Sequence, residues 1–175
     1  MKKRIAVLAV NPVNGFGLFQ YLETFFENEI QYKTFAVADT KSIKTNSGIS
    51  IQTDDVVANL KGNEGEYDAL VFACGDAMPK FSENATKQYN QDMLEVMKNF
   101  DNKGKMLIGH CVAALLFDKV GIGNGKRVAL HPFIKSMVTG CIGTDEQFVV
   151  DGNLYTAQTE HAINLLLPEL LNTLK

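Results

Sequence analysis

The chain passes, at residues 106–115, through Met106-Leu107-Ile108-Gly109-His110-Cys111-Val112-Ala113-Ala114-Leu115. Its first residues are typical of a buried strand, and the residues after the cysteine favour a helix. A strand that enters a helix through one sharp turn has the outline of a nucleophile elbow, in which the middle residue is strained and its neighbours must be small. Gly109 and Ala113 flank Cys111 at the two positions where bulk would clash. The stretch therefore predicts an α/β protein with Cys111 at the carboxyl end of its sheet.

A thiol at this turn lies at the N-terminus of the predicted helix. Unpaired backbone N–H groups there, with Val112 the first of them, and the helix dipole favour thiolate and lower the pKa of a cysteine. The alternative is a cysteine that simply packs in the core, because free cysteine is among the most buried residue types. The motif alone leaves both interpretations of Cys111 open.

Apolar and amphipathic segments alternate along the chain. Continuous apolar runs at residues 5–10 and 69–73 are typical of parallel strands covered on both faces, and a further strand is expected at 32–38. Amphipathic stretches at 18–26, 85–100 and 112–120 predict helices. Strands that alternate with helices imply a doubly wound sheet, mostly parallel.

Two hairpins and a closing helix complete the predicted elements. Short apolar segments separated by polar, glycine-containing turns predict hairpins over residues 43–51 and 148–156. The last helix is expected from Glu160 to Leu174, with Thr159 as its N-cap and Pro168 as a kink.

Length and charge exclude several classes of protein. The 175 residues fit one domain, residues 1–175, so any active site must be built within a single fold. The net charge of −3 provides no positive field for a nucleic acid or an anionic membrane. The apolar run after Lys2-Lys3-Arg4 ends at Asn11-Pro12, too early for a signal peptide. We therefore expect a soluble, cytoplasmic protein with neither nucleic acid nor membrane as partner.

The sequence shows no pattern for a metal or a cofactor. Three cysteines, the third of them Cys141, are too few for a disulfide framework and lack C-x-x-C spacing. Gly15-Phe16-Gly17 follows the first strand as in a dinucleotide-binding turn, but Gln20 stands where a third glycine is needed for close packing. We expect neither a bound metal nor a bound cofactor.

Four segments in order along the chain resemble the ThiJ/PfpI family, the group that includes the human parkinsonism-associated protein. They are residues 67–75, residues 109–113 around the cysteine, residues 126–132 ending in His131-Pro132, and residues 148–156. The resemblance covers nearly the whole chain. It implies a flavodoxin-like three-layer sandwich related to class I glutamine amidotransferases, with helices on both faces of the sheet, and a homodimer.

The resemblance also implies roles for individual residues. Cys111 matches the reactive cysteine, and His131 matches a histidine near that thiol. Gly75 matches one of two glycines whose N–H groups approach the pocket, and Cys74 replaces the other. An acidic residue that hydrogen-bonds the sulfur is usual five positions after a glycine in the first helix. Counted from Gly15, that position holds Gln20.

This departure separates two functions. An amide can donate to the sulfur, but it cannot exchange a proton as a carboxyl can. One interpretation is a cysteine-dependent enzyme of glyoxalase or amidase type, with Cys111, His131 and Gln20 as catalytic residues, acting on a reactive carbonyl or responding to peroxide. The other is a non-catalytic binding or regulatory module that has lost the acid.

Three neighbouring side chains have competing interpretations. Cys74 is either a resolving thiol for Cys111 or a small residue standing in for glycine. Glu23, one turn after Gln20, either replaces the missing acid or is a solvated surface residue, the interpretation that we favour. His110 precedes the cysteine and points to the opposite face of its strand, so a peptidase triad is not expected.

Overall fold

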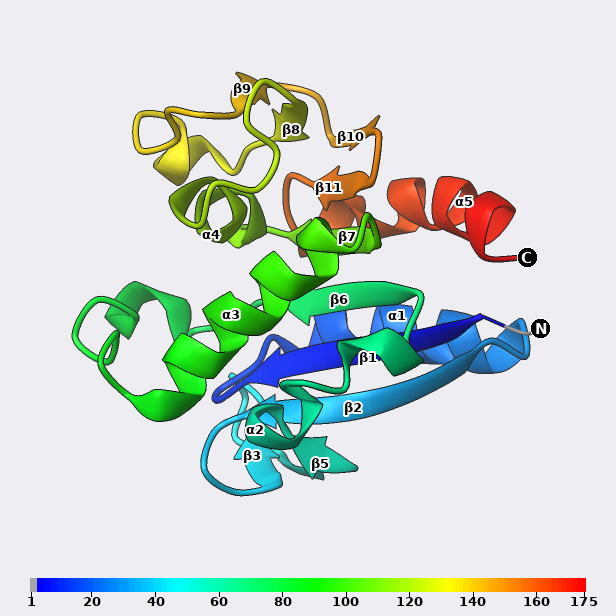
Figure 1. The fold of residues 1–175 in the computed structure, drawn as a ribbon, viewed down its shortest axis with the longest axis vertical. Helices are drawn as coiled ribbons and strands as arrows, with labels where there is room; N and C mark the ends of the chain where they lie inside the picture. Colours follow the sequence, from blue (N-terminus) through cyan, green and yellow to red (C-terminus); the bar gives the residue numbers. More distant parts are fainter. Residues whose placement is uncertain (1–2) are drawn as a thin grey trace.

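The structure, a computed structural model, describes residues 3–175. Its main sheet has, within these residues, seven strands in the order β10-β11-β7-β6-β1-β2-β5 (Figure 1). All neighbouring pairs are parallel except β10 with β11. The strands are β1 Arg4–Val10, β2 Gln31–Val37, β5 Asp55–Val56, β6 Ala69–Ala73, β7 Met106–His110, β10 Phe148–Asp151 and β11 Leu154–Ala157. The predicted mostly parallel α/β sheet is confirmed.

Helices cover both faces of this sheet. Helices α1 and α5 pack against each other on one face, and α2 packs against α3 on the other, with α3 in front of the sheet in Figure 1. The α-helices are α1 Gly15–Glu27, α2 Val57–Leu60, α3 Gln88–Asn102, α4 Ala113–Lys119 and α5 Ile163–Leu174. Short 3-10 helices are η1 Glu64–Glu66, η2 Met78–Lys80, η3 Pro132–Ile134 and η4 Glu160–Ala162. The three-layer sandwich is therefore confirmed.

The central strands are apolar because both of their faces are covered. Every residue of β6 is buried, as are the last six residues of β1. Burial on both faces removes the alternation of polar and apolar residues that a half-exposed strand shows. The continuous apolar runs at 5–10 and 69–73 therefore identified β1 and β6, two adjacent inner strands of the sheet.

Parallel pairing brings four strand ends to one edge of the sheet. Ala9 pairs with Ala73 across β1 and β6, and His110 pairs with Ala157 across β7 and β11. The segments that follow these four strands therefore lie next to one another, at the edge where open α/β sheets bind their ligands.

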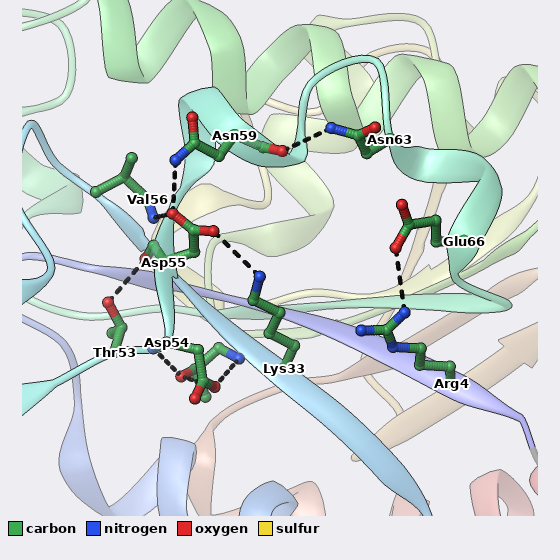
Figure 2. Close-up of polar contacts among 10 residues, drawn as sticks. Arg4, Lys33, Thr53, Asp54, Asp55, Val56, Asn59, Asn63 and Glu66 are labelled. Carbon is green, nitrogen blue, oxygen red and sulfur yellow. Dashed lines mark hydrogen bonds and ion pairs between the residues drawn. The ribbon is translucent and has the colours of Figure 1, made fainter.

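A polar network stabilises β5, the last strand at one side of the sheet (Figure 2). The Asp55 carboxylate accepts hydrogen bonds from Asn59 Nδ2 at 2.7 Å and from Lys33 Nζ at 3.1 Å. The Asn59 hydrogen bond is the largest cause that lowers the pKa of Asp55 to about 2. The ionised carboxylate thus ties the two-residue strand to β2 and α2.

The structure also differs from the predicted elements. Helix α3 begins at Gln88, because residues 81–86 form turns. Three short strands, β5, β8 (Arg127–Ala129) and β9 (Ile142–Thr144), were not predicted. The hairpin of β3 (Ser42–Lys44) and β4 (Ser50–Gln52) was predicted and is confirmed. Among the described residues, no helix is long and apolar enough to span a membrane.

Candidate active site

A cavity of about 430 Å³ opens where the four strand ends meet. Its walls include residues from the segments that follow all four of these strands. They include Asn14 after β1, Cys74 and Gly75 after β6, Cys111 after β7, Glu160 after β11, and also His131. Most of the lining is apolar, and among the described residues it contains no lysine or arginine. Of the residues proposed from sequence, the cavity brings together Cys111, Cys74, Gly75, Val112 and His131, but not Gln20.

The backbone at Cys111 is strained. Its φ is 57°, in the left-handed region that non-glycine residues rarely adopt. Gly109 makes the tight turn possible, because a Cβ there would lie 2.4 Å from the Cβ of Ala113. The Cys111 N–H donates to Ala157 O at 3.2 Å, which ties the turn to β11. This geometry presents the thiol to the cavity, and Cys111 remains half-buried.

Gly75 allows the segments after β1 and β6 to touch. A Cβ at this position would lie 2.3 Å from Pro12 O and 2.5 Å from Val13 Cα. The two segments are joined by hydrogen bonds from Asn14 N to Cys74 O at 2.9 Å and from Ala77 N to Pro12 O at 3.3 Å. The absence of a side chain at Gly75 therefore lets these two segments pack together beside the cavity that Cys74 lines.

Two hydrogen bonds stabilise the Cys111 thiolate. The Cys74 thiol is the largest cause that lowers the pKa of Cys111, and the Val112 N–H lowers it further. Burial and the carboxylates of Glu160 and Asp76 act in the opposite direction. The balance leaves the pKa of Cys111 below that of an ordinary cysteine, which favours the nucleophilic form near neutral pH.

Cys74 is the proton-donating member of this pair of thiols. Its hydrogen bond to Cys111 and its burial raise its pKa well above the ordinary value. The N–H groups of Val112 and Gly75 act in the opposite direction on the pKa of Cys74, but they are the smaller causes. Both thiols are free. The structure thus pairs a nucleophilic sulfur with a protonated one.

The expectation that Gln20 donates to the sulfur is wrong. Its Nε2 donates to Glu160 O at 2.9 Å and to Phe16 O at 3.1 Å. Gln20 therefore joins α1 to η4 and does not contact Cys111. Glu23 is exposed on α1, as the surface interpretation predicted.

The two histidines of the cavity differ in their surroundings. His110 is fully buried, and its Nδ1 lies 3.5 Å from Tyr21 Oη on α1, so its ring points to the helix. Burial lowers the pKa of His110 to about 4, so the ring is neutral at pH 7. The Nδ1 of His131 accepts the N–H of Phe133 at 3.2 Å, which leaves Nε2 as a donor.

Sequence reasoning missed Glu160 as a residue of the site. Its carboxylate lines the cavity, and its Oε1 accepts a hydrogen bond from Asn14 Nδ2 at 3.3 Å. The sequence did contain a signal for Glu160, because it directly follows the predicted cap residue Thr159. Thr159 Oγ1 accepts the N–H of His161 at 3.2 Å, so the residue predicted to cap the closing helix caps η4, which leads into α5. Glu160 therefore lies in the first turn after β11.

The cavity continues into a second hollow of about 310 Å³. Met78, Pro79, Val112, Phe133 and Ile134 line both hollows. The residues that line only the second hollow are apolar, except for Ser82 and Lys119. The site is therefore larger than a two- or three-carbon aldehyde requires.

We expect Cys111 to be the first of the three thiols to alkylate near pH 7. The thiolate is the reactive form, and only Cys111 has a lowered pKa, whereas burial raises the pKa of Cys141 to about 12. Mass spectrometry after limited treatment with iodoacetamide measures the order of labelling. Faster labelling of Cys74 or Cys141 would contradict the assignment.

Fold and site together define a flavodoxin-like α/β protein with a cysteine at a strand–helix turn. The model of the DJ-1/PfpI family matches residues 3–173, and the chain belongs to that family. This confirms the resemblance drawn from the sequence.

Similar proteins agree with this membership. Protein ppBat of Bacteroides thetaiotaomicron is 59% identical over the full length of both chains. A crystal structure from the same organism, which carries a provisional protease I name, is 59% identical, covers 99% of both chains and has a TM-score of 0.98. DJ-1beta of Drosophila melanogaster, 17% identical, shares the fold, with a TM-score of 0.84 over 99% of this chain and 91% of that one.

Proposed function

We propose that the protein acts on small uncharged electrophiles, reactive carbonyls above all, through covalent attack by Cys111. The observation that carries the proposal is a thiol of lowered pKa that lines a cavity. Around Cys111 the lining of the 430 Å³ cavity is mostly apolar, with two carboxylates and no lysine or arginine among the described residues, which favours an uncharged substrate over an anion. The chemistry is that of a cysteine-nucleophile hydrolase or lyase.

The neighbouring groups have separate roles in this proposal. The Val112 N–H and the Cys74 thiol stabilise the Cys111 thiolate before attack. The Nε2 of His131 is available to donate to the substrate oxygen, because its Nδ1 is already occupied. A peptidase is not proposed, since the ring of His110 points to α1.

Turnover of methylglyoxal tests the proposal. The wild-type protein is expected to release lactate above the uncatalysed rate, and alkylation of Cys111 by one equivalent of iodoacetamide is expected to abolish that activity. If no turnover is measured, a binding or regulatory module becomes the better interpretation.

A response to peroxide is a second candidate, favoured by the hydrogen bond between the two thiols. Peroxide oxidises the Cys111 thiolate to a sulfenic acid, with release of hydroxide. The Cys74 thiol then forms a disulfide with release of water, provided that the backbone allows Cα atoms within about 7 Å.

We expect mild peroxide to give this disulfide in the wild type, and a Cys111 sulfinate in Cys74→Ser, because no resolving thiol remains there. Peptide mapping by mass spectrometry distinguishes the two products. Sulfinate formed equally fast in both proteins would show that Cys74 only fills the position of a glycine.

We also propose a cytoplasmic homodimer, on the strength of the family membership. Light scattering coupled to size exclusion measures the mass in solution, and a monomer at all concentrations would contradict the dimer.

A further inference from the structure

We infer that Glu160 is the general acid–base residue that works with Cys111. The inference rests on the proposed function and identifies a catalytic group for it. Two carboxylates line the cavity, those of Asp76 and Glu160. Asp76 is exposed, whereas the side chain of Glu160 is only 27% exposed. Glu160 is also the carboxylate with the larger electrostatic effect on Cys111.

Two amides of α1 position Glu160. Asn14 Nδ2 donates to its Oε1 at 3.3 Å, while Asn14 Oδ1 accepts the Gly17 N–H at 2.8 Å and so caps α1. Gln20 Nε2 donates to the backbone oxygen of Glu160 at 2.9 Å. The Nε2 of the exposed His161 lies 3.9 Å from Oε1 of Glu160. Oε2 has no hydrogen-bond partner among the described residues, so it is free to exchange a proton with a substrate.

The other titratable groups of the cavity are less suited to this role. His110 is buried against Tyr21, and its pKa of about 4 makes it a weak base. His131 already uses Nδ1 as an acceptor, so its second nitrogen donates. Cys74 is held protonated by burial and by its hydrogen bond to Cys111. Glu160 is the carboxylate of the cavity that is both held in place and unpaired at one oxygen.

The chemistry balances with a 2-oxoaldehyde as substrate. The Cys111 thiolate adds to the aldehyde carbon, and the oxygen takes a proton to give a hemithioacetal. Glu160 removes the proton from that carbon while the adjacent carbonyl oxygen takes a proton from solvent, which gives an enediol. Glu160 then returns its proton to the adjacent carbon, and the hydroxyl of the first carbon loses its proton to solvent, so the adduct becomes a 2-hydroxyacyl thioester. Water then hydrolyses the thioester, releasing the 2-hydroxy acid and the thiol, with no external oxidant or reductant.

Glu160→Gln tests the inference, because it is expected to change two rates in opposite directions. Methylglyoxal turnover should fall by about 100-fold or more, as when a general acid–base group is lost. Alkylation of Cys111 by iodoacetamide should not slow and should become faster, because the negative charge that opposes the thiolate is removed. Glu23→Gln, at an exposed position of α1, is the matched control and should leave both rates unchanged.

Each other outcome is also informative. Wild-type turnover in Glu160→Gln overturns the role of Glu160 and leaves the proposed function intact. A parallel loss of turnover and alkylation shows a structural role and also overturns the inference. No turnover in the wild type overturns the proposed function, and with it the role of Glu160. Protection of the buried Cys141 from alkylation reports that each variant is folded.

A double-mutant cycle tests Gln20 as a positioning residue. Gln20→Ala removes the hydrogen bond to Glu160 O, so turnover should fall while alkylation of Cys111 is retained. The same change should have no further effect on turnover when Glu160 is already Gln, because the two residues act through one group. Equal losses in both backgrounds would show that Gln20 does not act through Glu160.

Discussion

Cys111→Ala is expected to reduce the turnover of methylglyoxal to the uncatalysed rate. The change removes the only cavity thiol whose pKa is lowered, and Cys74 cannot replace it because its own pKa is raised. Alanine suits the comparison because it keeps a Cβ at a position where φ is 57°. The backbone strain is therefore similar in both proteins, and stability should change little.

Lactate release by the wild type, Cys111→Ala and Cys141→Ala at equal concentration measures this effect. Cys141→Ala is the matched control, because it removes a buried thiol that contacts Ile122 O at 3.5 Å and does not line the cavity. It should retain wild-type turnover. Activity that survives in Cys111→Ala would place the chemistry on another group.

Gly75→Ala is expected to lower the free energy of unfolding by about 3 kcal/mol or more, at the upper end of the range for overpacked positions. The added Cβ would meet three backbone atoms, Pro12 O at 2.3 Å, Val13 Cα at 2.5 Å and Asn14 N at 2.7 Å. Backbone cannot rotate away as a flexible side chain can. The segments after β1 and β6 would have to separate, which would also disturb the cavity.

Urea unfolding followed by circular dichroism measures the loss of stability. Gly65→Ala is the matched control, because a Cβ at Gly65 has no atom within 4 Å and its φ is not positive. Its unfolding midpoint should stay close to that of the wild type. Equal midpoints for Gly75→Ala and the wild type would show that the two segments separate at little cost.

Glu160 bears on the choice between enzyme and binding module. The module interpretation depended on the loss of an acid where Gln20 stands. The cavity nevertheless contains a carboxylate, which comes from η4 at the other end of the chain. Gln20 and Asn14 hold that segment against α1. An amide in the first helix is therefore compatible with acid–base chemistry at this site.

Local sequence determined the central elements of the protein. Continuous apolar runs identified β1 and β6, because a strand buried on both faces is apolar at every position and does not alternate with polar residues. The strand–helix turn around Cys111 could be predicted from Gly109 and Ala113, since their contact depends on residues only four apart. Family resemblance then added His131 to the cavity, at a position that its own surroundings in sequence do not reveal.

Only the tertiary structure decided how the acid, the amide and the thiols are arranged. Two-residue β5 has no periodicity to read, and it exists because β2 offers it an edge. Whether Gln20 meets the sulfur or a backbone carbonyl depends on where η4 packs against α1, and η4 lies at the far end of the chain. The shared edge of the sheet brings Glu160 to Cys111. Periodicity reports the burial of each segment, whereas contacts between distant segments are set by strand order and helix packing, which no local pattern encodes.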